Sequence, residues 1–198
     1  MARLVLVRHA SHGLLGRVLA GRMPGVALSD AGRAEADCLA QVLAGEPVRA
    51  VWTSPVQRAV ETARPIAAQH GLVPIAEPGL EEVDFGDWTG QPFEALPGAA
   101  WQAWNRDRAM ATPPGGETML AVQARAVATM HRAGESEGAG EGVVVLVSHQ
   151  DVIKAMLAYV LGMPLDLLHR FDVAPASRSI VRIGPGWAVV AGINAALV

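Results

Sequence analysis

Two short runs of branched apolar residues, far apart in the chain, each end in polar residues that include a histidine. The first run, near the start of the chain, is followed by Arg8 and His9. The second run covers residues 143–147 and is followed by Ser148 and His149. Continuous apolar runs of this length are typical of strands buried on both faces of a sheet. If the two strands are parallel neighbours, their histidines lie side by side at one edge of the sheet.

Patterns of helical period alternate with the predicted strands, and turn residues separate the two. We expect helices from Ser29 or Asp30 to about residue 45, from an N-cap at Ser54 with Pro55 in the first turn to about residue 71 with a kink at Pro65, from about 117 to 131, and after His149. Further strands are expected at 50–52, at 72–76 and on both sides of the turn at 184–186. This alternation predicts an α/β fold: a three-layer α/β/α sandwich with a mainly parallel central sheet and a C-terminal edge hairpin.

The stretch from residue 77 to residue 116 has no regular period, and prolines interrupt it repeatedly. It is too long to be a plain connection, so we expect it to form a cap or lid over a site. Four aromatic residues fall within it: Trp88, Phe93, Trp101 and Trp104. We expect them to pack the cap and in part to contact a ligand of apolar or planar character.

Length and composition limit the class of protein. The chain has 198 residues, of which 51% are hydrophobic and 18% charged, so we expect a single compact domain over residues 1–198. A net charge of −3 gives no polybasic surface, so neither nucleic acid nor an anionic membrane is an expected partner. The single cysteine, Cys38, excludes an internal disulfide. No leader segment is visible, and no apolar run approaches the roughly 18 residues of a membrane helix, so we expect a cytoplasmic protein.

Three of the predicted strands end in residues suited to binding an anion. They supply Arg8 and His9, then Thr53 and Ser54 with Arg58 one helical turn further on, and finally Ser148 and His149. Ligands of open parallel sheets bind at the carboxyl ends of the strands. Guanidinium groups match phosphate oxygens, and helix N-termini favour negative charge. The sequence therefore predicts a site for a phosphate-sized anion, although Arg58 could instead pair with Glu61 or Glu35.

At these positions the chain resembles the histidine phosphatase superfamily, also called the phosphoglycerate mutase-like family. Six segments match in order over nearly the whole chain, which makes the resemblance specific. They are LVRH at 6–9, ALSDAG at 27–32, TSPVQRAVETA at 53–63, LEEVDFGDWTG at 80–90, PGGET at 114–118 and VSH at 147–149.

The resemblance implies a role for each residue of the site. His9 would attack phosphorus and carry the phosphoryl group as a phosphohistidine, while Arg8, Arg58 and His149 hold the phosphoryl oxygens. Glu82 would protonate the leaving oxygen and then accept a proton from the attacking water, with Glu81 as its positional rival. No metal and no cofactor are expected, because fixed cations stabilise the transferring group.

The chain departs from the family pattern directly after the Arg-His pair. Glycine is usual there, followed by an acidic or amide residue and then Thr or Ser, whereas this chain has Ala10, Ser11 and His12. An asparagine that many members place a few residues later is also missing. We expect that either the phosphate pocket lacks a donor or Ser11, His12 or Arg17 replaces it.

Three functions remain open. The first is a metal-independent phosphatase that hydrolyses a small phosphorylated metabolite. The second is a phosphoglycerate mutase, which shares the intermediate but for which an apolar, tryptophan-rich cap is poorly suited. The third is a phosphate-binding or regulatory module that has lost turnover through its altered loop. The sequence leaves the substrate open, and the final hairpin could be a sheet edge or a homodimer contact.

Overall fold

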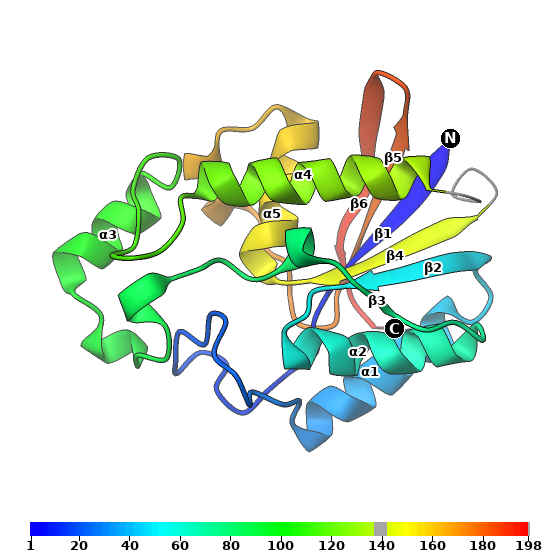
Figure 1. Cartoon of the computed structure of the whole chain (residues 1–198), viewed down its shortest axis with the longest axis horizontal. Coiled ribbons are helices and arrows are strands. Elements are labelled where there is room, and N and C mark those ends of the chain that lie inside the picture. Colours follow the sequence, from blue (N-terminus) through cyan, green and yellow to red (C-terminus); the bar gives the residue numbers. More distant parts are fainter. Residues whose placement is uncertain (137–141, 198) are drawn as a thin grey trace.

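A six-stranded sheet lies at the centre of the fold (Figure 1). The computed structural model describes residues 1–136 and 142–197. Its strands are β1 (Ala2–Arg8), β2 (Val48–Thr53), β3 (Ile75–Ala76), β4 (Val143–Ser148), β5 (Arg178–Gly184) and β6 (Trp187–Ala195). The strand order is β3-β2-β4-β1-β5-β6, with the first four strands parallel and the last two antiparallel to their neighbours. The mainly parallel sheet and the C-terminal edge hairpin are thereby confirmed.

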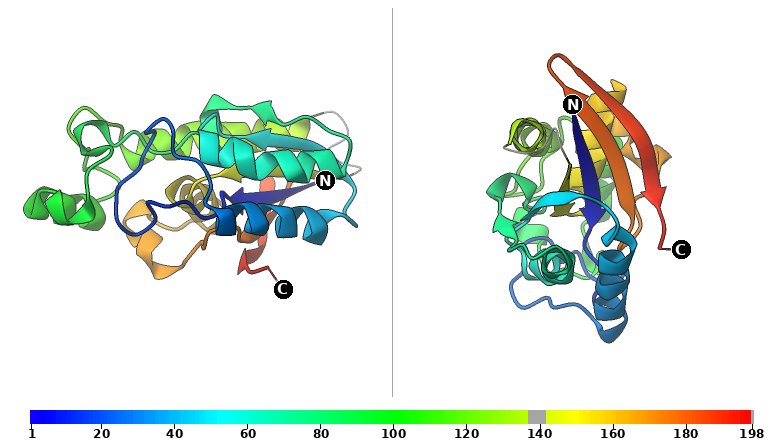
Figure 2. Two further views of the ribbon diagram at one scale, coloured as in Figure 1. Left: turned by 90° about the horizontal axis from the view of Figure 1, so that it is seen from below. Right: turned by 90° about the vertical axis from the view of Figure 1, so that its right-hand side faces the viewer.

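Helices cover both faces of this sheet. They are α1 (Asp30–Leu43), α2 (Gln57–Gln69), α4 (Met119–Glu135) and α5 (Gln150–Leu161), whereas α3 (Gly98–Arg106) lies beyond the sheet (Figure 1). Side chains of β1 alternate between the two faces: Leu4 and Leu6 pack in one core with α4 and α5, while Val5 and Val7 pack in the other with α1 and α2. In the left view of Figure 2, α1 and α2 lie in front of the strands and α4 and α5 behind them. The fold is a three-layer α/β/α sandwich.

The pairing of β1 with β4 fixes the position of the two histidines. The strands are parallel, with Val7 opposite Val147 and Arg8 opposite Ser148. One further backbone hydrogen bond runs from the His9 N–H to the Ser148 carbonyl, at 2.9 Å. Both strands end at the same level, so His9 and His149 leave the sheet side by side, as the sequence predicts.

The start of α2 differs from the prediction. Ser54 is not its N-cap; the helix begins at Gln57, after an extended Val56, and it continues across Pro65. The reason is that sheet pairing extends past β2, since the Ser54 N–H donates to the Val147 carbonyl at 2.9 Å. The Ser54 hydroxyl accepts from the Val56 N–H at 3.2 Å and lies at the carboxyl end of β4, 2.8 Å from His149 Nε2.

The segment 77–116 forms a cap beyond the carboxyl ends of the parallel strands (Figure 1). It contains the short 3-10 helices η1 (Pro78–Leu80), η2 (Gly86–Trp88) and η3 (Phe93–Ala95), and also α3, which the sequence did not reveal. Trp88 and Trp104 are buried in the core that α4 and α5 share. The cap is thus packed onto the domain by its own aromatic side chains.

Two further predictions concern the end of helix α4 and membrane-spanning helices. The helix α4 extends to Glu135, beyond its predicted end at residue 131. The stretch 134–142 is rich in glycine and glutamate, which predicts a linker, and most of it lies outside the described residues. Within the part of the chain that the structure describes, no helix is long and apolar enough to cross a membrane.

Candidate active site

His9 is buried at the end of β1, and its two ring nitrogens have different partners. Nδ1 lies 2.9 Å from the Ala10 carbonyl oxygen, while Arg58 Nε donates to Nε2 at 3.1 Å. Because a carbonyl only accepts and a guanidinium only donates, the proton belongs on Nδ1 and the lone pair on Nε2. Burial, together with the charges of Arg58 and Arg8, holds the pKa of His9 well below its usual value. His9 is therefore a neutral imidazole whose single lone pair, on Nε2, accepts from Arg58.

His149 lies beside His9, with 5.1 Å between the ring centroids. Its Nδ1 is 3.1 Å from Arg58 Nη2, and its Nε2 is 2.8 Å from the Ser54 hydroxyl oxygen. Since Arg58 only donates, the proton of a neutral His149 belongs on Nε2 and is donated to Ser54. Burial first, and then the charge of Arg58, hold the pKa of His149 well below its usual value.

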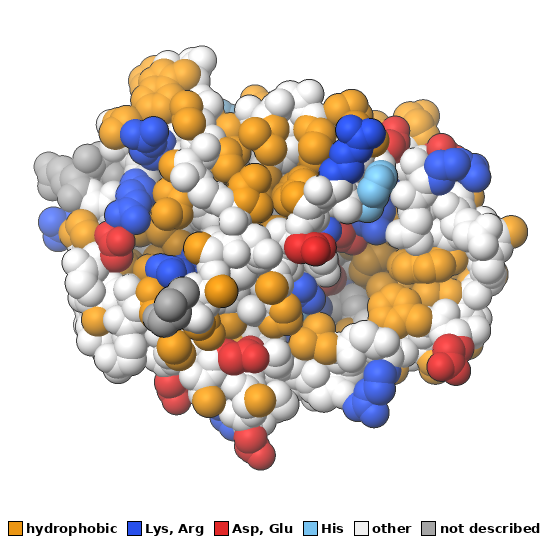
Figure 3. All heavy atoms as spheres, turned by 180° about the vertical axis from the view of Figure 1, so that it is seen from behind, with side chains coloured by type: hydrophobic (Ala, Val, Ile, Leu, Met, Phe, Trp, Pro, Cys, Tyr) orange, Lys and Arg blue, Asp and Glu red, His pale blue; other side chains and the backbone are white. Residues whose placement is uncertain are grey.

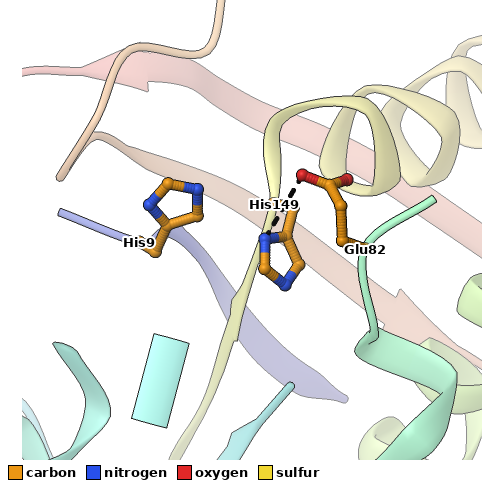
Figure 4. Close-up of side chains that lie close together, drawn as sticks. All are labelled: His9, Glu82 and His149. Atoms are coloured by element: carbon orange, nitrogen blue, oxygen red, sulfur yellow. Dashed lines mark ion pairs between the residues drawn. The ribbon is translucent and has the colours of Figure 1, made fainter. Parts of the chain in front are cut away.

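Glu82 approaches the two histidines from the start of the cap (Figure 4). Its Oε2 atom lies 3.4 Å from both His149 Nδ1 and Arg58 Nη2. Burial raises the pKa of Glu82 against the opposing charge of Arg58, so its protonated form persists at higher pH than in an ordinary carboxyl. The neighbouring Glu81 instead faces Arg22, with 3.4 Å between Oε2 and Nη1. The backbone thus turns only the second of these two carboxyls toward the histidines.

Two arginines give the site its positive charge. Arg58 is 1% exposed, yet its Nη1 has no hydrogen-bond partner among the described residues. Arg8 donates from Nη1 to the Val173 carbonyl at 2.7 Å, while its Nε is buried without a partner. Buried donors without acceptors are costly, and a bound oxyanion would satisfy them. The arrangement suits a phosphoryl group placed against His9 Nε2.

A cavity of about 360 Å³ opens from these groups toward the cap. The wall includes Arg8 and His9 at the end of β1, His12 in the loop that follows, and Arg58 in α2. The cap contributes Glu82, Phe85, Phe93, Trp101 and Arg108, and α5 contributes Gln150, Asp151 and Lys154. Figure 3 shows a hollow on this face, with hydrophobic side chains along one side and charged side chains and a histidine nearby. The cavity therefore has a cationic floor and a partly aromatic wall.

The loop after β1 differs in part from the expectation. His12 lines the cavity, its ring centroid 5.4 Å from that of His9, and burial lowers the pKa of His12 to about 4. Ser11 is not among the lining residues: its hydroxyl and its N–H both donate to Glu35, at 2.9 and 2.8 Å. The exposed Arg17 donates to the Gly13 carbonyl, and its side chain does not line the cavity either. Ser11 is thus bonded to Glu35 of α1, and Arg17 is bonded to its own loop. Of the three expected replacements, only His12 faces the cavity.

Ala10 causes no strain where the family uses glycine. Among the described residues other than glycine, only Ala176 and Asn194 have positive φ angles. Ala10 is fully buried, and its N–H donates to the Thr62 hydroxyl at 3.0 Å. The turn after His9 therefore accommodates a methyl group.

The sequence prediction did not include Ser54 as a partner of His149, nor the lining residues Arg108, Asp151 and Lys154. Arg108 Nη1 and Asp151 Oδ2 form an ion pair of 2.8 Å that joins the cap to α5. A signal for Lys154 was present, because a lysine interrupts an otherwise apolar helix. Arg108 had none, since nothing in the sequence of the cap shows where its side chain points.

Two guanidinium groups hold the backbone of Glu82. Arg22 Nε and Arg125 Nη2 both donate to the Glu82 carbonyl, at 2.8 and 3.1 Å. Glu117 joins the two arginines, since its Oε1 accepts from Arg22 Nη2 and from Arg125 Nη2, each at 2.7 Å. The same oxygen accepts from the Asp84 N–H at 2.9 Å. The segment that carries the Glu82 carboxyl is therefore fixed by charge-assisted hydrogen bonds on its far side.

His9, Glu82 and His149 also form a group whose ligating atoms lie within 4.8 Å of one another, a spacing that could suit a metal ion. The sequence contains no metal-ligand spacing, so this cluster is a product of the fold. Arg58, however, contacts all three side chains. A divalent cation here would lie against a buried guanidinium, whose repulsion is strong at low dielectric. The cluster is better suited to an anion.

Comparisons with known proteins agree with this geometry. Residues 4–196 match the family model described as histidine phosphatase superfamily (branch 1). The chain is 39% identical over 166 residues to an uncharacterized protein of Mycobacterium tuberculosis, Rv0525, covering 79% of this chain and 77% of the relative. It is 34% identical over 174 residues to a glucosyl-3-phosphoglycerate phosphatase of Mycolicibacterium vanbaalenii, covering 83% of this chain and 76% of the relative.

A solved structure agrees as well. Mycobacterial glucosyl-3-phosphoglycerate phosphatase Rv2419c in complex with VO3 superposes with a TM-score of 0.88, at 29% identity, over 99% of this chain and 100% of that one. The chain belongs to the histidine phosphatase superfamily. It is an enzyme of the phosphatase class.

The hydrogen bonds that Arg22 and Arg125 donate to the Glu82 carbonyl give a first prediction. Arg22→Ala removes one of the two guanidinium groups from the Glu82 carbonyl, so we expect faster amide exchange over residues 79–84. We also expect hydrolysis of phosphomonoesters to fall by up to about 10²-fold, since small misplacements of reacting groups are that costly. Hydrogen exchange and steady-state kinetics measure the two effects.

Arg132→Ala is the matched control for Arg22→Ala. Arg132 joins α4 to the same part of the cap through a 2.8 Å pair with Glu77, and it does not contact Glu82. Equal losses of activity in the two variants would mean that the Arg22 contact only stabilises the fold.

Proposed function

We propose that the protein is a metal-independent phosphomonoesterase that hydrolyses a small phosphorylated metabolite through a phosphohistidine on His9. The observation that carries this proposal is the surroundings of His9 Nε2. The Nε2 atom is unprotonated and its lone pair accepts only from Arg58 Nε, so this lone pair becomes the nucleophile when a phosphoryl group replaces that contact. Guanidinium donors without partners and a carboxyl with a raised pKa lie close by. This combination supplies a nucleophile, a charged cradle and an acid for phosphoryl transfer.

In the first step, His9 Nε2 attacks phosphorus while the bond to the leaving oxygen breaks. Arg8 and Arg58 donate to the phosphoryl oxygens, and their charge stabilises the transferring group. His149 donates to the same oxygens once its proton has moved from Nε2 to Nδ1. Glu82 gives its proton to the leaving alcohol. The products of this step are the free alcohol, a phosphoryl group on His9 and an ionised Glu82.

In the second step, a water molecule attacks the phosphorus of the phosphohistidine. Glu82, now ionised, accepts a proton from this water as the P–N bond breaks. His9 returns to its neutral form and inorganic phosphate leaves. A carboxyl whose pKa is raised by burial is suited to both roles, because its protonated form persists to higher pH and its ionised form is a stronger base than an ordinary carboxylate.

Two alternatives share parts of this site. A phosphoglycerate mutase would return the phosphoryl group to the bound alcohol, whereas the aromatic wall of Phe93 and Trp101 suits a less polar leaving group. A module that only binds phosphate would require a damaged nucleophile or cradle, and the altered loop leaves His9 and both arginines in place. Hydrolysis is therefore favoured over both.

The nucleophile gives the second prediction. Purified protein in excess EDTA should release phosphate steadily from 4-nitrophenyl phosphate, and His9→Ala should reduce this rate by several orders of magnitude. His131→Ala, on α4 and outside the cavity, is the control. A rate that depends on added metal, or that persists in His9→Ala, would contradict the proposal.

The acid gives the third prediction, which concerns pH. Above the raised pKa of Glu82 the carboxyl loses the proton that the leaving group needs, so kcat should fall on the alkaline side. The low pKa values of His9 and His149 should keep both rings neutral into the acid range. Glu82→Gln should lower kcat by about 10²–10⁴-fold and flatten the alkaline limb, as measured with a substrate whose alcohol leaves poorly.

Glu81→Gln is the matched control for Glu82→Gln, because it removes the adjacent carboxyl, which faces Arg22 and lies outside the cavity. If Glu82→Gln kept the full rate and the same alkaline limb, Glu82 would not be the acid.

A further inference from the structure

The cavity contains a second carboxylate that the proposed chemistry does not use. Asp151 lies in the first turn of α5, two residues after His149, and lines the cavity together with Glu82. Its side chain is 19% exposed. Glu82 in turn lies 3.4 Å from His149 Nδ1. Two carboxyl groups, one of them the proposed acid, therefore border the same partly buried space, where charges influence each other more strongly than in water.

The charge of Asp151 is compensated from the cap. Arg108 Nη1 lies 2.8 Å from Asp151 Oδ2, and both side chains are largely buried. Arg108 is held by residues of its own segment, since its Nη2 donates to Asn105 Oδ1 at 2.9 Å and its guanidinium carbon lies 5.4 Å from the centroid of the Trp104 ring. The compensating cation thus belongs to the cap, whereas the carboxylate belongs to the helix that follows His149.

The charged and titratable groups around the Glu82 carboxyl come from every element that meets at the cavity. They are Arg8 and His9 at the end of β1, His12 in the next loop, Arg58 in α2, His149 after β4, Asp151 and Lys154 in α5, His169 beyond α5 and Arg108 in the cap, with Arg22, Glu81, Asp84, Glu117 and Arg125 on the far side of the Glu82 backbone. Burial raises the pKa of Glu82, the charge of Arg58 lowers it, and the charge of Asp151 raises it again. Among the described residues that line the cavity with Glu82, Asp151 is the one other carboxylate.

We infer that Asp151 and Arg108 are positioning residues that act through Glu82: the Asp151 carboxylate favours a proton on Glu82, and Arg108 limits how much of that negative charge Glu82 experiences. This inference rests on the proposed function, in which Glu82 must be protonated when the leaving alcohol departs. Arg8 and Arg58 hold the phosphoryl group but also favour the ionised form of Glu82. The Asp151 carboxylate opposes their effect without touching the reacting atoms.

The alternative is that the pair of Arg108 and Asp151 only holds the cap in place. The cap has a second tie to the same side of the domain, since the Ala109 N–H donates to Asp166 Oδ1 at 2.9 Å in the segment after α5. Asp166 is not among the residues that line the cavity. The two ties share the task of holding the cap, but of the two only Arg108 with Asp151 places charge in the cavity.

The test measures the pH dependence of kcat with a phosphomonoester whose alcohol leaves poorly, because that reaction needs the proton of Glu82. Asp151→Asn keeps the size of the side chain and an oxygen that can accept from Arg108, and it removes only the charge. It should move the midpoint of the alkaline limb to lower pH by about half a unit or more. Arg108→Met removes the compensating cation and should move the midpoint to higher pH by a similar amount.

Asp166→Ala is the matched control, because it releases the cap at Ala109 without changing the charge in the cavity. It should leave the midpoint at its value in the natural chain, whatever its effect on kcat. Opposite shifts in Asp151→Asn and Arg108→Met support the inference, since a loosened cap cannot move the midpoint in both directions. Unchanged midpoints in both variants, or shifts in the same direction, would overturn it.

A titration without substrate separates the inference from the proposed function. In protein labelled with ¹³C at the glutamate carboxyl carbons, the Glu82 signal is assigned by its loss in Glu82→Gln and is followed by NMR against pH. Its titration midpoint should fall in Asp151→Asn and rise in Arg108→Met even if no phosphomonoester is hydrolysed. A Glu82 midpoint that neither substitution moves contradicts the inference whether or not turnover occurs.

Discussion

A single buried guanidinium connects every part of the site. Arg58 Nε donates to His9, while its Nη2 lies against the Gly21 carbonyl, His149 and Glu82. These contacts fix the tautomer of His9 and hold Glu82 at the rim. Together with burial, which is the larger cause, the charge of Arg58 keeps the pKa of both imidazoles low. The remaining nitrogen, Nη1, is left for an anion. Burial of this cation costs free energy unless its N–H donors find acceptors, and the protein together with a bound anion would supply them.

The rest of the fold is arranged to maintain this contact set. Parallel pairing of β1 with β4 ends both strands at one level, and pairing of β2 with β4 brings Ser54 to His149 and starts the helix that carries Arg58. From the opposite side, Glu117 and two arginines hold the backbone of Glu82. The cap closes over the site through its own aromatic packing. His9 and His149 are thus placed by strand ends and Arg58 by the start of α2, whereas Glu82 and the aromatic wall belong to the cap.

The strand ends could be predicted from the sequence because apolar runs and their polar ends are local patterns. Arg8, His9, Arg58 and His149 were identified in this way, and the fold brings them together. Helix α3 and Arg108 could not be predicted, because the segment from 77 to 116 takes its shape from contacts with α4 and with the 3-10 helix η5 (Leu165–Arg170) and not from its own period. For Ser11 the prediction of a substrate contact is not supported, because its hydroxyl and its N–H both donate to Glu35. Lys154 interrupts an otherwise apolar helix, but the sequence does not show that this side of α5 faces the cavity.

The central claim is that His9 carries the phosphoryl group, and trapping that group tests it most directly. Protein mixed with a ³²P-labelled phosphomonoester and quenched in alkali within milliseconds should contain label that is stable to base and labile to acid. Peptide mapping should place this label on His9, and His9→Ala should contain none. Steady hydrolysis without any labelled protein, or label on another residue, would contradict the account.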